Sequence, residues 1–579
     1  MKILNLLFSF LVLFIVINLF DSQASFQIDL SALGIKGVVI ALKATALSNF
    51  FALLSSASMV VISFFAFTYE LRARFFILLE LLGASLLLIV YAQDYLLFFI
   101  GWEIMSWSTY LLLSNTLDSR SLHKYILFAM ASALTLLAAI MILYSGAKSF
   151  LYADLHVSYQ ALSQQMRYLF IICMLSGIFI KTGTIGFHYW LVDTYEKSAD
   201  IFSAFLSAVL SKMGIYALII FVVYLGRVEI NYGYVLAIMG VVSSIIATFK
   251  AMNEDSIKRV LAYSSIAQLG YIVTVLALPD ALSGALYHAV IHTAVKLLLF
   301  INVAGVIYVT SRHKFSELGA LIHKMPYSFV FMLIGIIVLA GMPPLGGFNS
   351  KFLIYSSLLQ TNHLLILSAM MFASASAFLY IYKLIYGIYL GQPTCKDSLH
   401  VKEVSLWFLL PQFALSLLLI ILGAFPALLV PYFNQILNQL HKTPMEFSSI
   451  STLYSEIGSF NGLIVISAFV AVFVLVALFL IKVKSKIKRA KNRFDIAYCG
   501  EVPDHNTPLH YGFSMAKELK RVGFISSILK NSSSFFYEYL ATSIHAFSDI
   551  LRRIYSGNMS INFNVAILFA LILLLWGLK

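Results

Sequence analysis

The stretch QDYLLFFIGWEIMSWSTYLLL, residues 93–113, decides how the chain has to fold. It is long and apolar enough to cross the ~30 Å hydrocarbon core of a bilayer as a helix. It nevertheless carries a carboxylate, Glu103, near its middle. A charged side chain there costs about 2.5 to 3.5 kcal/mol on insertion scales. We therefore expect a charged residue at this position of a membrane helix to have a function.

The composition of the whole chain agrees with a membrane protein. Of 579 residues, 61% are hydrophobic and 11% charged, with a mean hydropathy of +0.91, whereas soluble domains carry roughly a quarter charged residues. Apolar runs of about 20 residues recur from end to end. The alternating pattern of a membrane barrel is absent, as is a polar stretch long enough for a soluble catalytic domain. The sequence therefore predicts an all-α, polytopic membrane protein of about 15 transmembrane helices.

The apolar runs can be drawn as sixteen spans, which is one more than the charge pattern allows. With Lys2 inside, strict alternation puts residues 482–493 outside, although seven of these twelve residues are basic. We place the surplus at the irregular stretch 343–361. The spans are residues 3–20, 46–68, 73–92, 95–114, 123–145, 168–192, 201–226, 232–250, 258–278, 281–310, 326–342, 344–361, 363–390, 404–430, 462–481 and 561–578.

Charge and cysteine usage limit the possible partners. The net charge of +13 comes from short basic segments between apolar runs, which is typical of cytoplasmic loops and not of nucleic-acid binding. Cys173, Cys395 and Cys499 are far apart, so no iron-sulfur, c-haem, zinc or disulfide framework is indicated.

The first 25 residues could be a cleavable signal, but we favour a first membrane helix. We expect a multi-pass protein of the bacterial inner membrane, without cofactor, metal or catalytic residues of its own.

Two glycine-containing stretches interrupt helical patterns. The first is IKTGTIGFHYW, residues 180–190, which contains Gly183 and Gly186. The second is GMPPLGGFNSKF, residues 341–352. Broken helices at matching positions in two halves of a transporter indicate an ion path, because interrupted backbone survives only beside a cavity or other protein. The pattern predicts these parts: N-terminal helices at 1–89, half-channel repeats at 90–226 and 232–390, C-terminal helices at 391–481, a basic segment with an amphipathic helix at 482–560, and a final anchor at 561–579.

Several ionisable residues lie inside the expected spans, and they are the candidate site for proton translocation: Glu103, Lys181, Lys212, His288, His292, Lys296 and Lys351. Three of them, His288, His292 and Lys296, are spaced i, i+4 and i+8, so they share one face of a helix. Such a ladder can relay protons, because burial disfavours the charged form of each group and a nearby charge can then tip its protonation.

Less specific interpretations exist for each residue. Glu103 and Lys212 could form static bridges between helices. The lysines beside the two breaks, Lys181 and Lys351, could extend toward the membrane surface. The two ladder histidines could be ordinary packing residues, and His188 is better explained as structural. Haem is disfavoured, since no second helix offers a matching histidine pair.

Taken together, five motifs resemble the antiporter-like subunits of respiratory complex I, group 4 membrane hydrogenases and Mrp sodium/proton antiporters. They cover about residues 45–390 in unbroken order and read GWEIMSWSTYLLL, IKTGTIGFHYWL, DSIKRVLAYSSIAQLGY, HAVIHTAVKLLLF and GMPPLGGFNSKF. The tail, with YCGE and RRIYSGNMSINFNVAILFALILLLW, resembles most closely the B-type subunit of hydrogenase-4 and formate hydrogenlyase.

The resemblance implies two inverted five-helix repeats, each with a discontinuous helix. It assigns an essential carboxylate to Glu103, its partner lysine to Lys181 and a central lysine to Lys212. It assigns the second-half relay to His288, His292 and Lys296 and the terminal lysine to Lys351. We expect the pairing of Glu103 with Lys181 to gate the path, with water bridging the gaps.

This chain departs from the family pattern in the first half. Glycine stands at Gly186 where the family usually has proline, and the loop DTYEKSADIF carries extra charges at Glu196, Lys197 and Asp200. Lys43 replaces an acid near the N-terminus, and the chain is one span short before Glu103. These changes leave the ionisable core intact.

The expected function is a proton-translocating, antiporter-like subunit of a hydrogenase-4, formate hydrogenlyase or complex I-like (NADH-quinone oxidoreductase) complex. Its partners would be homologous antiporter-like subunits and a quinone- or hydrogenase-module membrane anchor, which would carry the redox chemistry. The alternatives are a subunit of an Mrp-type sodium/proton antiporter and a non-conducting scaffold.

Overall fold

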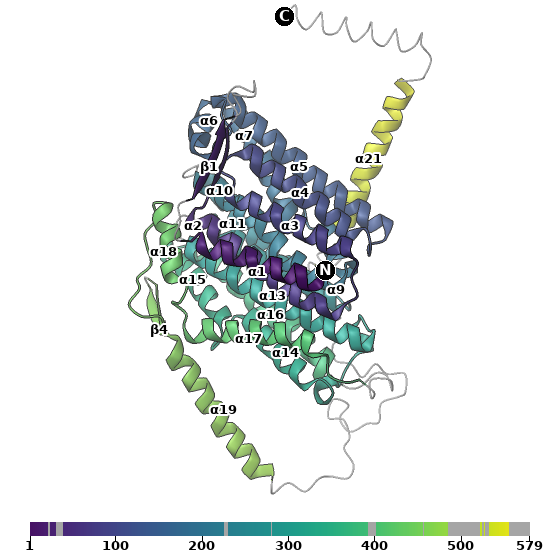
Figure 1. Cartoon of the computed structure of the whole chain (residues 1–579), viewed down its shortest axis with the longest axis vertical. Coiled ribbons are helices and arrows are strands. Elements are labelled where there is room, and N and C mark those ends of the chain that lie inside the picture. Colours follow the sequence, from purple (N-terminus) through teal and green to yellow (C-terminus); the bar gives the residue numbers. More distant parts are fainter. Residues whose placement is uncertain are drawn as a thin grey trace, which may run out of the picture. The chain divides into compact units, whose positions relative to one another are not determined.

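A computed structural model of the chain describes residues 1–20, 24–29, 39–224, 230–278, 281–391, 401–455, 457–484, 521–523, 526 and 532–554. It divides into two units, Met1–Glu518 and Leu519–Lys579. The first unit is a bundle of helices (Figure 1). The expected final anchor, at 561–578, and most of the basic segment lie outside the described residues.

The first half of the bundle contains ten α-helices and one π-helical segment among its described residues. They are α1 (Lys2–Asn18), α2 (Ala46–Phe65), α3 (Ala73–Tyr91), α4 (Tyr95–Leu113), α5 (Ser119–Ala147), α6 (Leu155–Ala161), α7 (Gln164–Thr182), α8 (Tyr189–Lys197), α9 (Asp200–Phe205), the π-helical η4 (Leu206–Leu210) and α10 (Ser211–Tyr224).

The second half also consists mainly of long apolar helices. It comprises α11 (Ile230–Asn253), α12 (Ile257–Leu276), α13 (Leu282–Thr310), α14 (Pro326–Ala340), α15 (Gly346–Gln360), α16 (Leu364–Ile385), the π-helical η7 (Tyr386–Leu390), α17 (Leu406–Ala424), α18 (Val430–Gln439) and α19 (Gly462–Lys484). The second unit contributes α21 (Ser532–Ile554).

Strands play a minor part in the described residues. β1 (Ser25–Asp29) and β2 (Val39–Lys43) form one antiparallel hairpin, in which Ser25 pairs with Lys43. β3 (Thr452–Ser455) and β4 (Gly458–Asn461) form another. Both hairpins are short and lie between helices in the chain. Nearly all other described elements are helices, so the predicted all-α fold class is confirmed.

Twelve helices in the described residues are long and apolar enough to span a membrane. All twelve correspond to expected spans. Of the other four, residues 3–20 and 326–342 correspond to α1 and α14, which are apolar but shorter. The stretch 344–361 corresponds to α15, which is not among the candidate spans. The placement of the surplus span at residues 343–361 stays a prediction, because α1 and α14 also fall outside the twelve.

Burial within the bundle separates its centre from its edge. Nearly every residue of α12 and α13 is buried by other helices, and so is the candidate span that runs from α9 through η4 into α10. None of the apolar window of α19 is buried, so α19 faces lipid or another protein along its length. The predicted ionisable core falls mainly on the most deeply buried helices.

Both predicted interruptions are present. α7 ends at Thr182, where Gly183 adopts a left-handed conformation with φ of +70°, and α8 begins only at Tyr189. α14 ends at Gly341, whose φ is +73°, and α15 begins at Gly346. Glycine is favoured at both caps because it alone adopts positive φ without a Cβ penalty. Each interruption thus places the end of a helix inside the bundle.

The second interruption depends on a close backbone approach that we expect to tolerate no side chain. A Cβ added at Gly347 would lie 1.9 Å from the carbonyl oxygen of Val338. Replacing Gly347 with alanine should therefore force the two half-helices apart, with a cost of about 1 to 3 kcal/mol or more. The measurement is the yield and melting temperature of the purified protein in detergent. Gly458→Ala is the control, since a Cβ there meets nothing within 4 Å. Equal melting temperatures for the two variants would contradict this account.

Candidate functional site

Lys181 lies at the first interruption, in the last turn of α7. Its side chain is buried and reaches toward α4, where Nζ lies 3.5 Å from Ser106 Oγ and 5.6 Å from the centre of the Trp102 ring. The break itself is held by Trp190, whose Nε1 donates to the Ile180 carbonyl oxygen over 2.9 Å. Lys181 is thus fixed at the carbonyl end of a half-helix, where a cation is favoured by the helix dipole.

Glu103 lies on the same helix as Ser106 but does not contact Lys181. Its carboxylate accepts a hydrogen bond of 3.0 Å from Trp107 Nε1, on the next turn of α4. In the described residues, no ion pair within 4.0 Å joins Glu103 to any lysine or arginine. Trp107 and Ile100 on the same side of α4 are exposed, and Glu103 is half-buried between them. The carboxylate therefore faces the edge of the bundle.

Lys212 occupies the centre, one residue after the start of α10. Its ammonium donates to the Ser207 carbonyl oxygen over 2.8 Å, and the side chain is 1% exposed. Ser207 belongs to η4, where the helix widens to π geometry. A π segment leaves carbonyl groups outside the regular α-helical ladder and is often found at functional sites. The irregular backbone supplies the oxygen that binds this lysine.

A series of hydrogen-bonded polar groups lies between Lys212 and Lys296. Ser207 Oγ and Ser265 Oγ are 2.8 Å apart, and Ser265 in turn donates to the Leu261 carbonyl oxygen over 2.9 Å. That oxygen also accepts a hydrogen bond of 3.1 Å from Lys296 Nζ. Since the Ser265 proton is directed to Leu261, Ser207 must donate to Ser265. The two lysines are therefore separated by two hydroxyls and by the carbonyl oxygens of Ser207 and Leu261, which only accept hydrogen bonds.

Lys296 is the most completely buried of the candidate lysines. It lies on α13 and donates to Ser264 Oγ as well as to Leu261, both on α12. Its side chain has no exposed surface. In the described part of the chain, no carboxylate lies within ion-pair distance of it. This lysine is held by neutral oxygens only.

The two histidines of the ladder follow Lys296 along one face of α13. Their rings stack with centroids 6.2 Å apart and an interplanar angle of 15°. His288 Nδ1 hydrogen-bonds to Ser350 Oγ over 3.0 Å. Neither ring nitrogen of His292, nor Nε2 of His288, has a hydrogen-bond partner among the described residues, although both rings are buried. Buried polar nitrogens of this kind are normally satisfied by water.

Lys351 lies at the second interruption, on α15. Its Nζ donates to the carbonyl oxygen of Ala340, the last residue of α14, over 2.7 Å, and to Ser374 Oγ over 2.6 Å. The Tyr271 ring connects it to the ladder, with its centre 5.4 Å from Lys351 Nζ and 5.8 Å from the His288 ring centre. Like Lys181, this lysine is placed at the carbonyl end of a half-helix.

The structure therefore brings together five of the seven predicted residues. Lys212, Lys296, His292, His288 and Lys351 form a buried series through the two halves of the bundle. Polar groups lie between Lys212 and Lys296, and Lys296 and His292 are about one turn apart on α13. The two histidine rings stack, and the Tyr271 ring lies between His288 and Lys351. Among the described residues, Lys181 is not hydrogen-bonded to this series, and Glu103 lies at the edge. Among the described residues, no set of three or more His, Cys, Asp or Glu side chains is placed to hold a metal ion.

The polar groups that complete the series were missed by the sequence analysis. They are the hydroxyls that bind lysines or join them, namely Ser106, Ser207, Ser264, Ser265 and Ser374. Serines are common in these helices, and no spacing separates the relay serines from those that bond only to their own backbone, as Ser55 and Ser108 do. Only the packing of one helix against another distinguishes them, as with α12 against η4 and α13 or α15 against α16.

The charged loop that departs from the family pattern forms ion pairs. Arg259 on α12 binds Asp193 and Glu196 of α8 and also Glu254, at 2.9 to 3.0 Å. Asp193 binds Lys124 of α5 as well. These five residues, which we name the loop cluster, join helices of both repeats at one end of the bundle.

Two further pairs extend the charged loop. Lys258 binds Asp200 at 2.7 Å, and Lys197 binds Asp118 at the same distance. Asp118 precedes α5 and is mostly solvent-exposed, and hydrogen bonds from the side chains of Lys197 and Ser121 lower its pKa to about 2. Each extra charge of the loop therefore has a partner of opposite charge outside the loop.

Comparison with known proteins identifies relatives of this fold. A family model described as "NADH:quinone oxidoreductase/Mrp antiporter, TM" matches residues 92–376. F(420)H(2) dehydrogenase subunit N of Methanosarcina mazei is 28% identical over 400 residues, which cover 65% of this chain and 80% of that protein. Na(+)/H(+) antiporter subunit A1 of Staphylococcus haemolyticus is 24% identical over 68% of this chain, and the match spans only about half, 52%, of that antiporter subunit.

Among solved structures, a chain of the membrane-bound sulfane sulfur reductase, an archaeal respiratory membrane complex, has the same fold. The TM-score is 0.86, with 24% sequence identity, over 99% of this chain and 95% of that chain. The helical architecture is thus shared along nearly the full length of both chains.

The loop cluster generates a prediction about stability. Asp193→Asn removes the shared partner of Lys124 and Arg259, so we expect a loss of about 2 kcal/mol, between the values for exposed and buried ion pairs. The matched control is Asp118→Asn, whose exposed pair with Lys197 should contribute about 0 to 1 kcal/mol. The measurement is the melting temperature in detergent at low and high salt. If the two substitutions have equal effects, the loop cluster does not tie the helices together.

Proposed function

Residues 92–376 belong to the transmembrane family of NADH:quinone oxidoreductases and Mrp antiporters, and from this premise we propose that the chain is the proton-translocating, antiporter-like membrane subunit of a respiratory oxidoreductase complex. The observation that carries the proposal is the buried series of polar groups between Lys212 and Lys296. It comprises the carbonyl oxygen and hydroxyl of Ser207, the Ser265 hydroxyl and the Leu261 carbonyl oxygen. The series lies between the two halves of the bundle. A scaffold held by static charges would need ion pairs at these lysines, whereas Lys212 and Lys296 have only neutral partners.

The lysines of this path suit transfer of a proton because neutral oxygens bind them. A lysine paired with a carboxylate would leave an unpaired anion when it loses its proton, which is costly in a membrane interior. Lys212 and Lys296 have carbonyl and hydroxyl partners instead. Serine hydroxyls both donate and accept, whereas the carbonyl oxygens that bind the two lysines only accept. Water between the lysines and the hydroxyls would therefore complete the transfer of a proton from one lysine toward the other.

The histidine ladder continues the path toward Lys351. Each imidazole has one nitrogen that accepts and one that donates in its neutral form. Water between the unpartnered nitrogens of His292 and His288 would complete the route, since water-mediated hydrogen bonds serve as well as direct ones. From His288 the route leads past Ser350 and Tyr271 to Lys351 and Ser374.

Glu103 would control the entrance to this path. Its carboxylate lies within electrostatic range of Lys181 but is bound by Trp107. We propose that Glu103 and Lys181 approach each other in one state of the cycle and separate in the other. The Lys181 proton would be retained when the two are together and released when they are apart.

The driving force would come from partner subunits, because the chain has no cofactor motif. We propose homologous antiporter-like subunits and a quinone- or hydrogenase-module membrane anchor as neighbours, in a bacterial inner membrane. The tail sequence, which resembles the B-type subunit of hydrogenase-4 and formate hydrogenlyase, favours a complex of that type. The exposed helices α19 and α21 are suited to contact with such neighbours.

A second candidate is a subunit of a sodium/proton antiporter without redox partners. The observation in its favour is the similarity to a staphylococcal Na(+)/H(+) antiporter subunit over 68% of this chain. The two candidates differ in their dependence on sodium. Proton transport in vesicles that is unaffected when sodium is replaced by potassium favours the oxidoreductase subunit, whereas strict dependence on sodium favours the antiporter.

The first prediction from this function concerns Glu103. Glu103→Gln keeps the hydrogen bond with Trp107 but removes the charge, so the assembled complex in vesicles should pump protons about 10²-fold more slowly or not at all. Complex assembly, checked by size-exclusion chromatography, should be unchanged. Glu446→Gln, the same change at an exposed loop residue, is the control. Normal pumping by the Glu103 variant would support the scaffold interpretation instead.

The second prediction concerns the hydroxyl link. Ser265→Ala removes the group between Ser207 and the Leu261 carbonyl oxygen. Proton pumping should fall about tenfold or more, while the redox activity of the partner subunits becomes uncoupled or slows in parallel. Ser368→Ala is the matched control, because that serine is exposed and bonds only to its own helix. An unchanged pumping rate in the Ser265 variant would show that protons take another route.

A further inference from the structure

Lys258 is a buried lysine in the first turn of α12 that has no part in the series between Lys212 and Lys296. Its Nζ lies 2.7 Å from a carboxylate oxygen of Asp200 and donates to the Ser198 carbonyl oxygen over 2.8 Å. The side chains of Lys258 and Asp200 are 6% and 18% exposed. An ion pair so shielded from water is screened less by salt than a surface pair, and the loss of one partner is costly. The pair therefore fastens the start of α12 to the start of α9.

Asp200 is the first residue of one continuous stretch of helix. α9, η4 and α10 follow one another without a gap from Asp200 to Tyr224, and the apolar window of this span is entirely buried. Ser207 lies seven residues, or about two turns, after Asp200. The position of Asp200 therefore decides where Ser207 points, since a slip by one residue would turn Ser207 by about 100° around the helix axis.

The same spacing recurs on α12. Ser265 lies seven residues after Lys258, and the Ser265 hydroxyl oxygen is 2.8 Å from that of Ser207. Residues about two turns apart lie on one face of a helix, so both contacts join the same two helix faces. The helix that begins at Asp200 and α12 thus meet in a matched register, with the ion pair at one point and the hydroxyl pair at the other.

The hydroxyl pair is sensitive to this register. A hydrogen bond between hydroxyl groups has a length of about 2.7 to 2.8 Å and is lost near 3.6 Å, so a relative displacement of about 1 Å separates the two oxygens. The displacement would affect the relation between two lysines, because η4 carries the carbonyl oxygen that binds Lys212 whereas α12 carries the groups that bind Lys296. Each lysine would keep its own partners, but the hydroxyls between them would no longer meet.

We propose that Asp200 and Lys258 are positioning residues, whose ion pair holds η4 against α12 so that the hydroxyls of Ser207 and Ser265 meet. The inference rests on the proposed function in so far as the polar groups between the two central lysines carry protons. Neither charged side chain has to gain or lose a proton in this role. The pair sets the distance across which the two halves of the bundle exchange one.

The other ion pairs at this end of the bundle join different helices. Arg259 on α12 binds carboxylates of α8 and also Glu254, and Lys197 of α8 binds Asp118, which precedes α5. Among the residues that the structure describes, the ion pair of Lys258 is the only one between α12 and the helix that begins at Asp200. Its loss would leave the register of these two helices to the hydroxyl pair and to apolar packing.

The test measures the contact between the two serines directly. In the purified full-length protein, with its three native cysteines replaced by serine, Ser207→Cys and Ser265→Cys place two thiols at the contact. Iodine, a small apolar oxidant, should convert them into a disulfide, because side chains in contact satisfy the short distance that the bond requires. Peptide mass spectrometry follows the rate. Asp200→Ala should slow disulfide formation severalfold, and Asp200→Glu, which keeps the charge, should restore most of the rate.

Two outcomes would contradict the proposal. A rate in the Asp200→Ala variant equal to that of the parent protein would remove the positioning role of the ion pair. Absence of the disulfide in every variant would remove the premise, which is the contact between Ser207 and Ser265.

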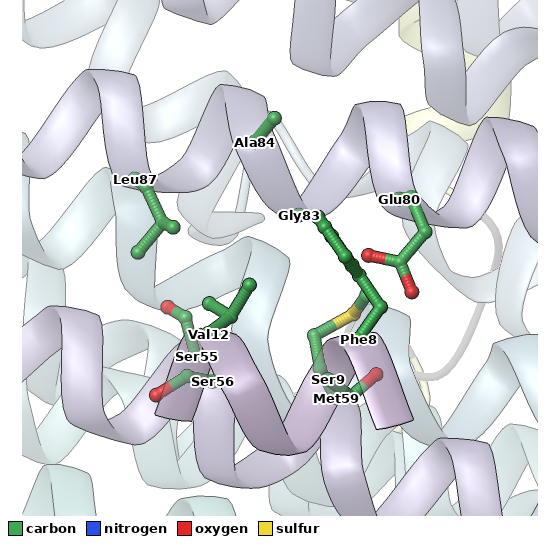
Figure 2. Close-up of a pocket in the computed structure, with 10 residues that line it drawn as sticks. All are labelled: Phe8, Ser9, Val12, Ser55, Ser56, Met59, Glu80, Gly83, Ala84 and Leu87. Atoms are coloured by element: carbon green, nitrogen blue, oxygen red, sulfur yellow. The ribbon is translucent and has the colours of Figure 1, made fainter. Parts of the chain in front are cut away.

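Glu80→Ala is the matched control, because it removes a carboxylate from another candidate span. Glu80 on α3 accepts a hydrogen bond from Asn5 of α1. It lines a cavity of about 90 Å³ whose lining residues, drawn in Figure 2, all belong to α1, α2 and α3. This variant also loses a hydrogen bond between helices, yet it should form the disulfide at the parent rate. If Glu80→Ala is as slow as Asp200→Ala, the bundle loosens generally and the ion pair has no specific effect on the register.

Proton pumping by the assembled complex gives a second readout. Asp200→Ala should slow pumping severalfold. Combined with Ser265→Ala it should slow pumping no further than Ser265→Ala alone, because both changes remove the same contact. Losses that multiply would show that Asp200 acts elsewhere. If Ser265→Ala alone pumps normally, the function proposed for the series fails, whereas the disulfide rate still decides whether the ion pair sets the register.

Discussion

The buried lysines of this protein are bound by neutral oxygen atoms. Lys212 and Lys351 each donate to a backbone carbonyl, and Lys296 donates to a carbonyl and a hydroxyl. Desolvation strongly disfavours a buried ammonium without a counter-charge. Both protonation states are therefore accessible at modest cost, because the neutral amine leaves no anion behind. This property distinguishes a proton path from a set of ion pairs that lock helices, such as the loop cluster at the end of the bundle.

The irregularities of the backbone exist where these oxygens are needed. Lys351 binds the last carbonyl of α14, and Lys212 binds a carbonyl of the π-helical segment η4. In a regular helix both oxygens would be used within the helical ladder. Interrupted backbone is tolerated in a membrane only where protein or a cavity satisfies it. The breaks and the lysines therefore satisfy each other, and neither would be stable alone.

The sequence predicts the helices and the breaks because both depend on residues that are close together in the sequence. Runs of about 20 apolar residues mark the spans, and Gly183 and Gly341 mark caps that need positive φ. The ladder of His288, His292 and Lys296 follows from helical spacing alone. The relay serines do not, because their role depends on which helix lies opposite.

The position of Glu103 limits what this chain does by itself. Its carboxylate is half-buried on the face of α4 that also exposes Ile100 and Trp107, and it accepts a hydrogen bond from Trp107. In a bilayer that face would meet hydrocarbon, where an ionised carboxylate is costly. Two arrangements would remove the cost of the ionised carboxylate. Glu103 could be protonated, or it could contact a polar surface of another subunit. The first alone would leave Lys181 without its electrostatic partner, so in the proposed mechanism the entrance to the path would be completed where another subunit covers α4.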